Sequence, residues 1–182
     1  MLIQLIAKHP EVLGQIVRQT PTWVWGLFAA LMALGISQLR DRTASLVRVS
    51  IMPVAMTIFS IWGTFTAFGS SPLFAQSLGV WALAAVIVFA IVARTRAKAR
   101  YDAATRSYSI PGSVIPLALI AGIFLVKYTV GVELTMAREL RLDSQYVLTV
   151  ATLYGAFTGM FIGRAARLWR LSYRAPATMA AA

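Results

Sequence analysis

Five long apolar stretches constrain the fold of this chain more than any other feature. They cover residues 22–39, 49–68, 75–93, 114–134 and 146–165. Each is close to the roughly 20 residues that a helix needs to cross a bilayer. Charged residues make up 13% of the 182 residues, about half the share found in soluble domains. The pattern predicts an all-α, polytopic transmembrane bundle of five helices within residues 21–170.

The basic residues between these stretches predict the orientation of the bundle. Lysine and arginine accumulate in short cytoplasmic loops. One side of the predicted bundle holds Arg40, Arg42, Arg48, Arg94, Arg96, Lys98, Arg100, Arg106, Arg164, Arg167, Arg170 and Arg174. The other side holds Lys8, Arg18, Arg138 and Arg141. We therefore expect a periplasmic N-terminus, a cytoplasmic C-terminus and a cytoplasmic tail at residues 171–182.

The sequence also predicts the structure of two segments outside the spans. Residues 1–20 have apolar side chains at helical spacing but no basic start before the apolar run and no small-residue cleavage site. They predict a periplasmic amphipathic helix at the membrane interface. In the basic cytoplasmic loop 94–113, apolar or aromatic residues flank the polar segment 102–106, which predicts a short hairpin.

The composition argues against several classes of function. The chain has no cysteine and one histidine, His9, so we expect no metal site and no cofactor. No nucleophile motif, carboxylate cluster or phosphate-binding glycine loop indicates an enzyme. The net charge of +11 is spread over the loops as insertion requires. We therefore expect the lipid bilayer, and not a nucleic acid, as its environment.

Two stripes of small residues lie within the spans. Gly155, Gly159 and Gly163 recur at every fourth position, a spacing that lets helix backbones approach closely, either inside one bundle or between copies of the chain. Thr57, Ser60 and Thr64 share one face of the second span. Their hydroxyls suit either tight packing or a wet pathway for an ion or proton.

Lys127 and Tyr128 stand out because they lie within the fourth apolar stretch. Counted from residue 113, Lys127 is about 21 Å into a core roughly 30 Å thick. Its stem could reach the outer headgroups, and that is the interpretation we expect. A functional role is the alternative, as an anion site, a proton relay or the counter-ion of Glu133.

Two segments resemble a known family. PGSVIPLALIAGIFLVKYTVG at 111–131 and RVSIMP at 48–53 are similar to a family of uncharacterised small bacterial integral membrane proteins, loosely similar in turn to the CcdC-like membrane proteins. The matching positions are Arg48, Pro53, Pro111, Gly112, Ser113, Lys127 and Tyr128. The resemblance implies a bacterial inner-membrane location.

These observations favour an accessory or structural membrane protein over a catalyst. We expect a small inner-membrane protein that self-associates or joins a larger membrane complex. The alternative hypothesis is a channel or transporter for a small ion or solute that uses Lys127 and the hydroxyl stripe Thr57, Ser60 and Thr64.

Overall fold

The chain folds as a helical membrane bundle with a small sheet at one end. A computed structural model describes residues 11–179. The helices are α2 (Glu11–Gln19), α3 (Thr22–Ser37), α4 (Leu46–Phe68), α5 (Phe74–Arg94), α6 (Ile115–Met136), the short 3-10 helix η1 (Arg138–Arg141) and α7 (Ser144–Met179). Within the described residues, α4, α5, α6 and α7 are long and apolar enough to cross a membrane. The apolar α3 has 16 residues. The predicted all-α membrane bundle is therefore confirmed.

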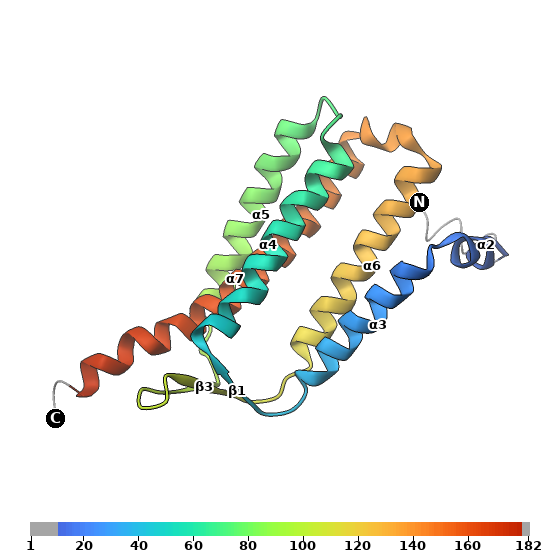
Figure 1. Cartoon of the computed structure of the whole chain (residues 1–182). Coiled ribbons are helices and arrows are strands. Elements are labelled where there is room, and N and C mark those ends of the chain that lie inside the picture. Colours follow the sequence, from blue (N-terminus) through green and yellow to red (C-terminus); the bar gives the residue numbers. More distant parts are fainter. Residues whose placement is uncertain (1–10, 180–182) are drawn as a thin grey trace.

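The five bundle helices form two groups (Figure 1). Helices α4, α5 and α7 pack together, and α3 pairs with α6. Successive helices from α3 to α7 run in alternating directions, so the connections gather at two ends of the bundle. One end holds the sheet, and the other holds the α4–α5 connection and η1.

The glycine series of α7 packs against α5 within the same chain. A Cβ atom added at Gly155 would meet the carbonyl oxygen of Trp81, and one at Gly159 would meet that of Ala85. A Cβ at Gly163 would lie 2.9 Å from the Cβ of Val92. Glycine is needed here because the two backbones are too close for any side chain. This face of α7 is used inside the chain.

A three-stranded antiparallel sheet covers the end of the bundle. Strand β3 (Ser107–Ile110) lies between β1 (Arg42–Ser45) and β2 (Arg100–Asp102). Strands β2 and β3 form a hairpin within the loop where the sequence predicts one. The side chain of Asp102 accepts hydrogen bonds from Ala104 N (2.9 Å) and Thr105 Oγ1 (2.8 Å), which fixes the turn. Strand β1 was not predicted from the sequence.

Helices α2 and α7 differ in extent from the predicted segments. The N-terminal helix was expected over residues 1–20, but α2 covers Glu11–Gln19 and residues 1–10 lie outside the described part. The last span was expected at 146–165, whereas α7 continues to Met179. Beyond the apolar stretch, Trp169 Nε1 donates a hydrogen bond to Ser50 Oγ at 3.0 Å. Hydropathy marks the end of the hydrocarbon region, but it does not mark the end of a helix.

Candidate functional site

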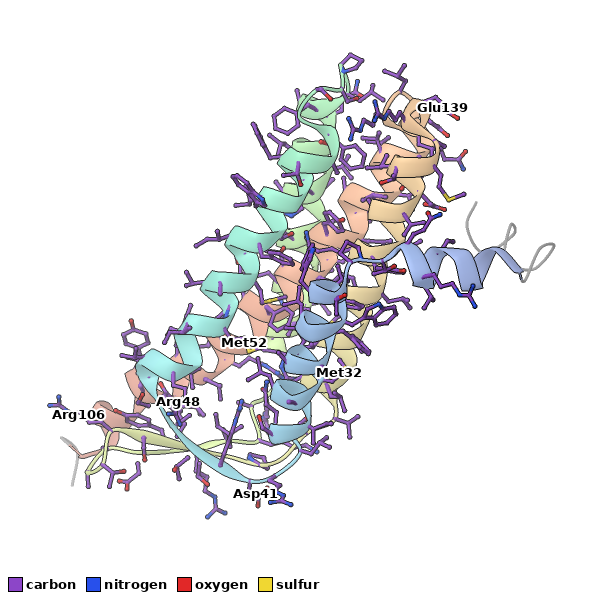
Figure 2. All side chains as sticks on the ribbon, turned by 45° about the vertical axis from the view of Figure 1, so that its right-hand side comes forward. Met32, Asp41, Arg48, Met52, Arg106 and Glu139 are labelled. Atoms are coloured by element: carbon purple, nitrogen blue, oxygen red, sulfur yellow. The ribbon has the colours of Figure 1, made fainter. Side chains whose placement is uncertain are left out.

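A groove opens between the α3–α6 pair and α4. Its volume is about 910 Å³, and it is lined by residues of α2, α3, α4 and α6 and of the α2–α3 connection. The walls are mainly apolar and include Leu27, Leu31, Met56, Phe59, Ile123 and Phe124. In the described chain, Lys127 is the charged residue among those that line the groove. Figure 2 shows the surrounding side chains, with α3 and α2 in front of α6.

The ammonium group of Lys127 lies between α6, α4 and α7. Its Nζ atom donates a hydrogen bond to the carbonyl oxygen of Phe59 at 3.2 Å. It also lies 4.2 Å from the ring centre of Phe59 and 4.6 Å from that of Tyr154. These contacts differ from the expectation that the side chain reaches the outer headgroups. The lysine side chain instead crosses toward the neighbouring helices.

Gly63 explains the direction of the lysine side chain. A Cβ atom at this position of α4 would collide with Nζ of Lys127. The missing side chain leaves a recess in α4 beside the Phe59 and Tyr154 rings, whose π faces attract a cation. The sequence suggests no special role for Gly63, because its effect depends on a residue of another helix.

Lys127 lies near the middle of α6. It is twelve residues after Ile115, the first residue of the helix, which corresponds to about 18 Å of rise. A lysine at the centre of a bilayer costs about 2.5–3.5 kcal/mol by insertion scales. Two cation–π contacts contribute about 1–2 kcal/mol each. The protein thus tolerates the ammonium there with the help of the Phe59 carbonyl and the rings of Phe59 and Tyr154.

Tyr128 joins α6 to the start of α3. Its hydroxyl forms a 2.6 Å hydrogen bond with Thr20 Oγ1, which itself donates to the Ile16 carbonyl at 2.7 Å. Tyr128 is therefore the donor in the first bond. Its ring stacks on Phe124 with 6.0 Å between centres and lies 6.3 Å from that of Trp25. Tyr128 closes one wall of the groove and fixes the α2–α3 connection over it.

The three hydroxyls of the α4 stripe all donate hydrogen bonds to backbone carbonyls. Thr57 Oγ1 donates to the carbonyl of Pro53 (2.7 Å), and Thr64 Oγ1 donates to that of Ser60 (3.1 Å). Ser60 Oγ donates to the Tyr154 carbonyl (3.3 Å) and accepts from Trp81 Nε1 (3.0 Å). Ser60 and Thr64 are buried. The structure brings Ser60 near Lys127, since both line a void of about 10 Å³ beside Tyr154, a volume that fits about one water molecule.

Glu133, the suggested counter-ion, is also buried. It lies further along α6 with 8% of its surface exposed. In the described residues, no group of three or more His, Cys, Asp or Glu side chains could hold a metal ion. The polar side chains that line the groove are those of Gln19, Thr20, Trp23, Lys127, Tyr128 and Thr135.

The sequence did not predict that Tyr154 of α7 and Thr20 of the α2–α3 connection belong to this site. Tyr154 is a tyrosine in an apolar span, and Thr20 precedes the first span. Neither has a local signal, since each is joined to α6 by contacts over long sequence separations. Lys127 could be identified from the sequence because it is a charged residue within an apolar stretch.

The comparisons give a family and no function. A family model described as "Family of unknown function (DUF6622)" matches residues 1–178. No curated protein and no solved structure matches the chain.

Proposed function

The chain belongs to the DUF6622 family of unknown function, and we propose that it is an accessory membrane protein that binds a lipid-soluble ligand in the groove. The ligand class is a single-chain amphiphile with a carboxylate headgroup. The observation that carries the proposal is one ammonium group within a large apolar groove. The binding role is non-catalytic.

Charge complementarity selects the headgroup. Lys127 Nζ has three N–H donors, and the hydrogen bond to the Phe59 carbonyl uses one of them. A carboxylate would accept the other two and neutralise the charge, which is favourable where water is scarce. The apolar walls formed by Leu31, Met56 and Ile123 would hold the hydrocarbon chain.

The size of the groove also fits such a ligand. Small-molecule sites usually have volumes of 300–1,000 Å³ and bury most of the ligand surface against apolar walls with few polar groups. At about 910 Å³, the groove is at the large end of this range, which suits a long chain better than a small ion.

The same geometry weighs against the channel hypothesis. A wet pathway needs hydroxyls that face a continuous opening. The hydroxyls of Thr57, Ser60 and Thr64 donate to backbone carbonyls, and two of these side chains are buried. Within one chain the stripe is better suited to packing than to conduction.

The proposed location is the bacterial inner membrane, with the N-terminus in the periplasm. The support is the distribution of basic residues together with their place in the fold. The connection before α4, the β2–β3 loop and the last part of α7 all lie at the sheet end of the bundle (Figure 1). The positive-inside rule then puts the sheet in the cytoplasm.

Self-association or membership of a larger membrane complex is part of the proposal. Nearly all of the described chain lies within the bundle and its small sheet, so any partner would meet it chiefly in the membrane. The glycine face of α7 is occupied by α5, and a partner would use another face. Native mass spectrometry from a mild detergent measures the stoichiometry; a strictly monomeric protein without partners would contradict this part.

Binding can be tested with two ligands and two lysine variants. The protein is placed in nanodiscs and titrated with a brominated long-chain fatty acid or the matching brominated alcohol, and tryptophan quenching is recorded. Lys127→Met removes the ammonium, whereas Lys98→Met makes the same charge change in the loop between α5 and β2. Losing one partner of a buried charge pair costs about 2–5 kcal/mol, so we expect at least about 30-fold weaker acid binding for Lys127→Met.

The alcohol and the second variant make the result specific. The alcohol should bind wild-type protein and Lys127→Met with affinities within about threefold, because it carries no charge to pair. Lys98→Met should bind both ligands like the wild type. Equal acid binding by all three proteins would refute the proposed function.

A further inference from the structure

A second feature lies at the sheet end of the bundle, where four arginines approach one another. This arginine cluster consists of Arg42 on β1, Arg48 in the first turn of α4, and Arg164 and Arg167 on α7. Burial and the neighbouring charge of Arg48 lower the pKa of Arg42. Arg164 in turn interacts electrostatically with both Arg42 and Arg167. The four like charges therefore form a connected set across three elements.

The register of the sheet places Arg42 on the same side of β1 as the buried Ala44, and Arg42 itself is exposed at the edge of that face. Ala44 lies opposite Tyr108 in the β1–β3 ladder, and Arg42 lies opposite Ile110. Alternate residues of a strand share a face, so Arg42, Ala44 and Tyr108 point the same way. Ala44 is 4% exposed and Tyr108 is 0% exposed. Since β2 also contacts α7, this is the face that closes on the bundle.

Two hydrogen-bond donors at this junction are buried without an acceptor in the described chain. They are the hydroxyl of Tyr108 and Nε of Arg167. Buried donors are almost always satisfied, and each exception calls for an explanation. The partners that the cluster does have are neutral: Arg42 Nη2 donates to Gln38 Oε1 at 2.8 Å, and Arg167 Nη1 donates to Thr95 Oγ1 at 2.6 Å.

The carboxylates at this end are engaged elsewhere. Asp41 Oδ1 accepts a hydrogen bond from Gly112 N at 2.7 Å, and Asp102 accepts bonds within the hairpin turn. Figure 2 shows Asp41, Arg48 and Arg106 at the sheet end and Glu139 at the opposite end. No hydrogen bond in the described residues joins either aspartate to an arginine of the cluster. Positive charge and unused donors thus occur together.

The depth of the cluster indicates the source of an anion. Arg164 is 20 residues after Ser144, the first residue of α7, and this corresponds to about 30 Å of rise. The hydrocarbon core is also about 30 Å thick. With Ser144 at one surface of the hydrocarbon core, the cluster lies at the level of the lipid headgroups on the sheet side of the bilayer.

We propose that the arginine cluster binds the phosphate headgroup of an anionic phospholipid at the junction of the sheet and α7. A guanidinium group presents two parallel N–H donors that match two phosphate oxygens. The phosphate would neutralise part of the clustered charge and accept hydrogen bonds from the guanidinium groups of Arg42 and Arg48, both of which are exposed. A zwitterionic lipid brings its own cation and compensates the cluster less well. This site is separate from the groove at Lys127.

The preference for an anionic lipid is measured by competition. Purified protein in a mild detergent receives equal amounts of phosphatidylglycerol and phosphatidylcholine, and native mass spectrometry gives the ratio of the retained lipids. Each arginine near a membrane surface contributes roughly fivefold to anionic-lipid affinity. The double variant Arg42→Gln/Arg164→Gln should therefore lower the ratio by about 25-fold.

Matched variants separate the site from a general effect of charge. Arg18→Gln/Arg138→Gln makes the same charge change on α2 and at the opposite end of the bundle, and should leave the ratio within about twofold. Arg42→Lys/Arg164→Lys keeps the charge but loses the planar fork, so it should lower the ratio by an intermediate factor. The lysine pair also serves if the glutamine pair does not fold.

Three results would overturn the proposal. The first is equal retention of the two lipids by the wild type. The second is an equal change of the ratio in both glutamine double variants. The third is displacement of phosphatidylglycerol by inorganic phosphate when the two are present at equal concentration. This result would show that the cluster binds free phosphate and not a lipid.

Discussion

Replacing Gly159 by alanine tests whether the glycine face of α7 belongs to the fold of one chain. The added Cβ would meet the carbonyl oxygen of Ala85 and lie 2.9 Å from Phe89 N and 3.0 Å from Val88 Cβ. Two of these three atoms belong to the backbone of α5 and cannot rotate away. Overpacking of this kind costs about 1–3 kcal/mol, while alanine regains about 0.8–1 kcal/mol of helix propensity. We therefore expect a net loss of up to about 2 kcal/mol in the free energy of unfolding.

Gly79 provides the matched control on the partner helix. It lies in α5, and a Cβ added there would meet nothing within 4 Å. Gly79→Ala should therefore stabilise the protein by up to about 1 kcal/mol, since only the propensity term remains. The assay is equilibrium unfolding in mixed detergent micelles, followed by circular dichroism, with size-exclusion chromatography in parallel. The reasoning would be refuted if Gly159→Ala changed the oligomeric state but left the unfolding free energy of the monomer unchanged.

Two further variants test the groove wall and the hairpin. Tyr128→Phe removes the hydrogen bond to Thr20 and should cost about 1 kcal/mol in a thermal unfolding assay; an equal effect of Tyr173→Phe, made at an 81% exposed tyrosine, would contradict this. The hydrogen bond from the Thr105 hydroxyl is the main cause that lowers the pKa of Asp102. The stabilisation of the folded hairpin by this carboxylate is therefore fully present above the unfolded pKa of about 3.9. It is lost as the pH falls through the lower pKa of the folded state. Hydrogen exchange of the hairpin amides should therefore be constant from neutral pH to about pH 5, after correction for the intrinsic rate, and accelerate only in stronger acid; Asp102→Asn should remove this acid-dependent step, and an unchanged profile would contradict the assignment.

Properties of single helices could be predicted from the sequence because they depend on local composition. The four spans from α4 to α7 follow from apolar length alone. The β2–β3 hairpin lies in the predicted loop because aromatic and apolar residues flank a turn that Asp102 stabilises. In contrast, β1 is only four residues long, and its strand conformation depends on pairing with β3, more than 60 residues further along the chain.

Relations between helices could not be predicted, and the lysine shows why. Helical periodicity gives the face on which Lys127 lies, but it does not say which helix that face meets. The direction of the side chain depends on the recess at Gly63 and on the rings of Phe59 and Tyr154. The arginine cluster has the same origin, since Arg42 of β1 interacts electrostatically with Arg164 of α7, more than 100 residues further along the chain.

The central claim is that Lys127 holds an acidic amphiphile in the groove, and the most direct measurement is to identify what the protein retains. Wild-type protein and the Lys127→Met and Lys98→Met variants are purified in a mild detergent, and bound small molecules are extracted and identified by mass spectrometry. We expect a long-chain carboxylate in near-stoichiometric amount with the wild type and Lys98→Met, and little or none with Lys127→Met. The same carboxylate content in all three proteins, or none in any of them after incubation with the fatty acid, would contradict the claim.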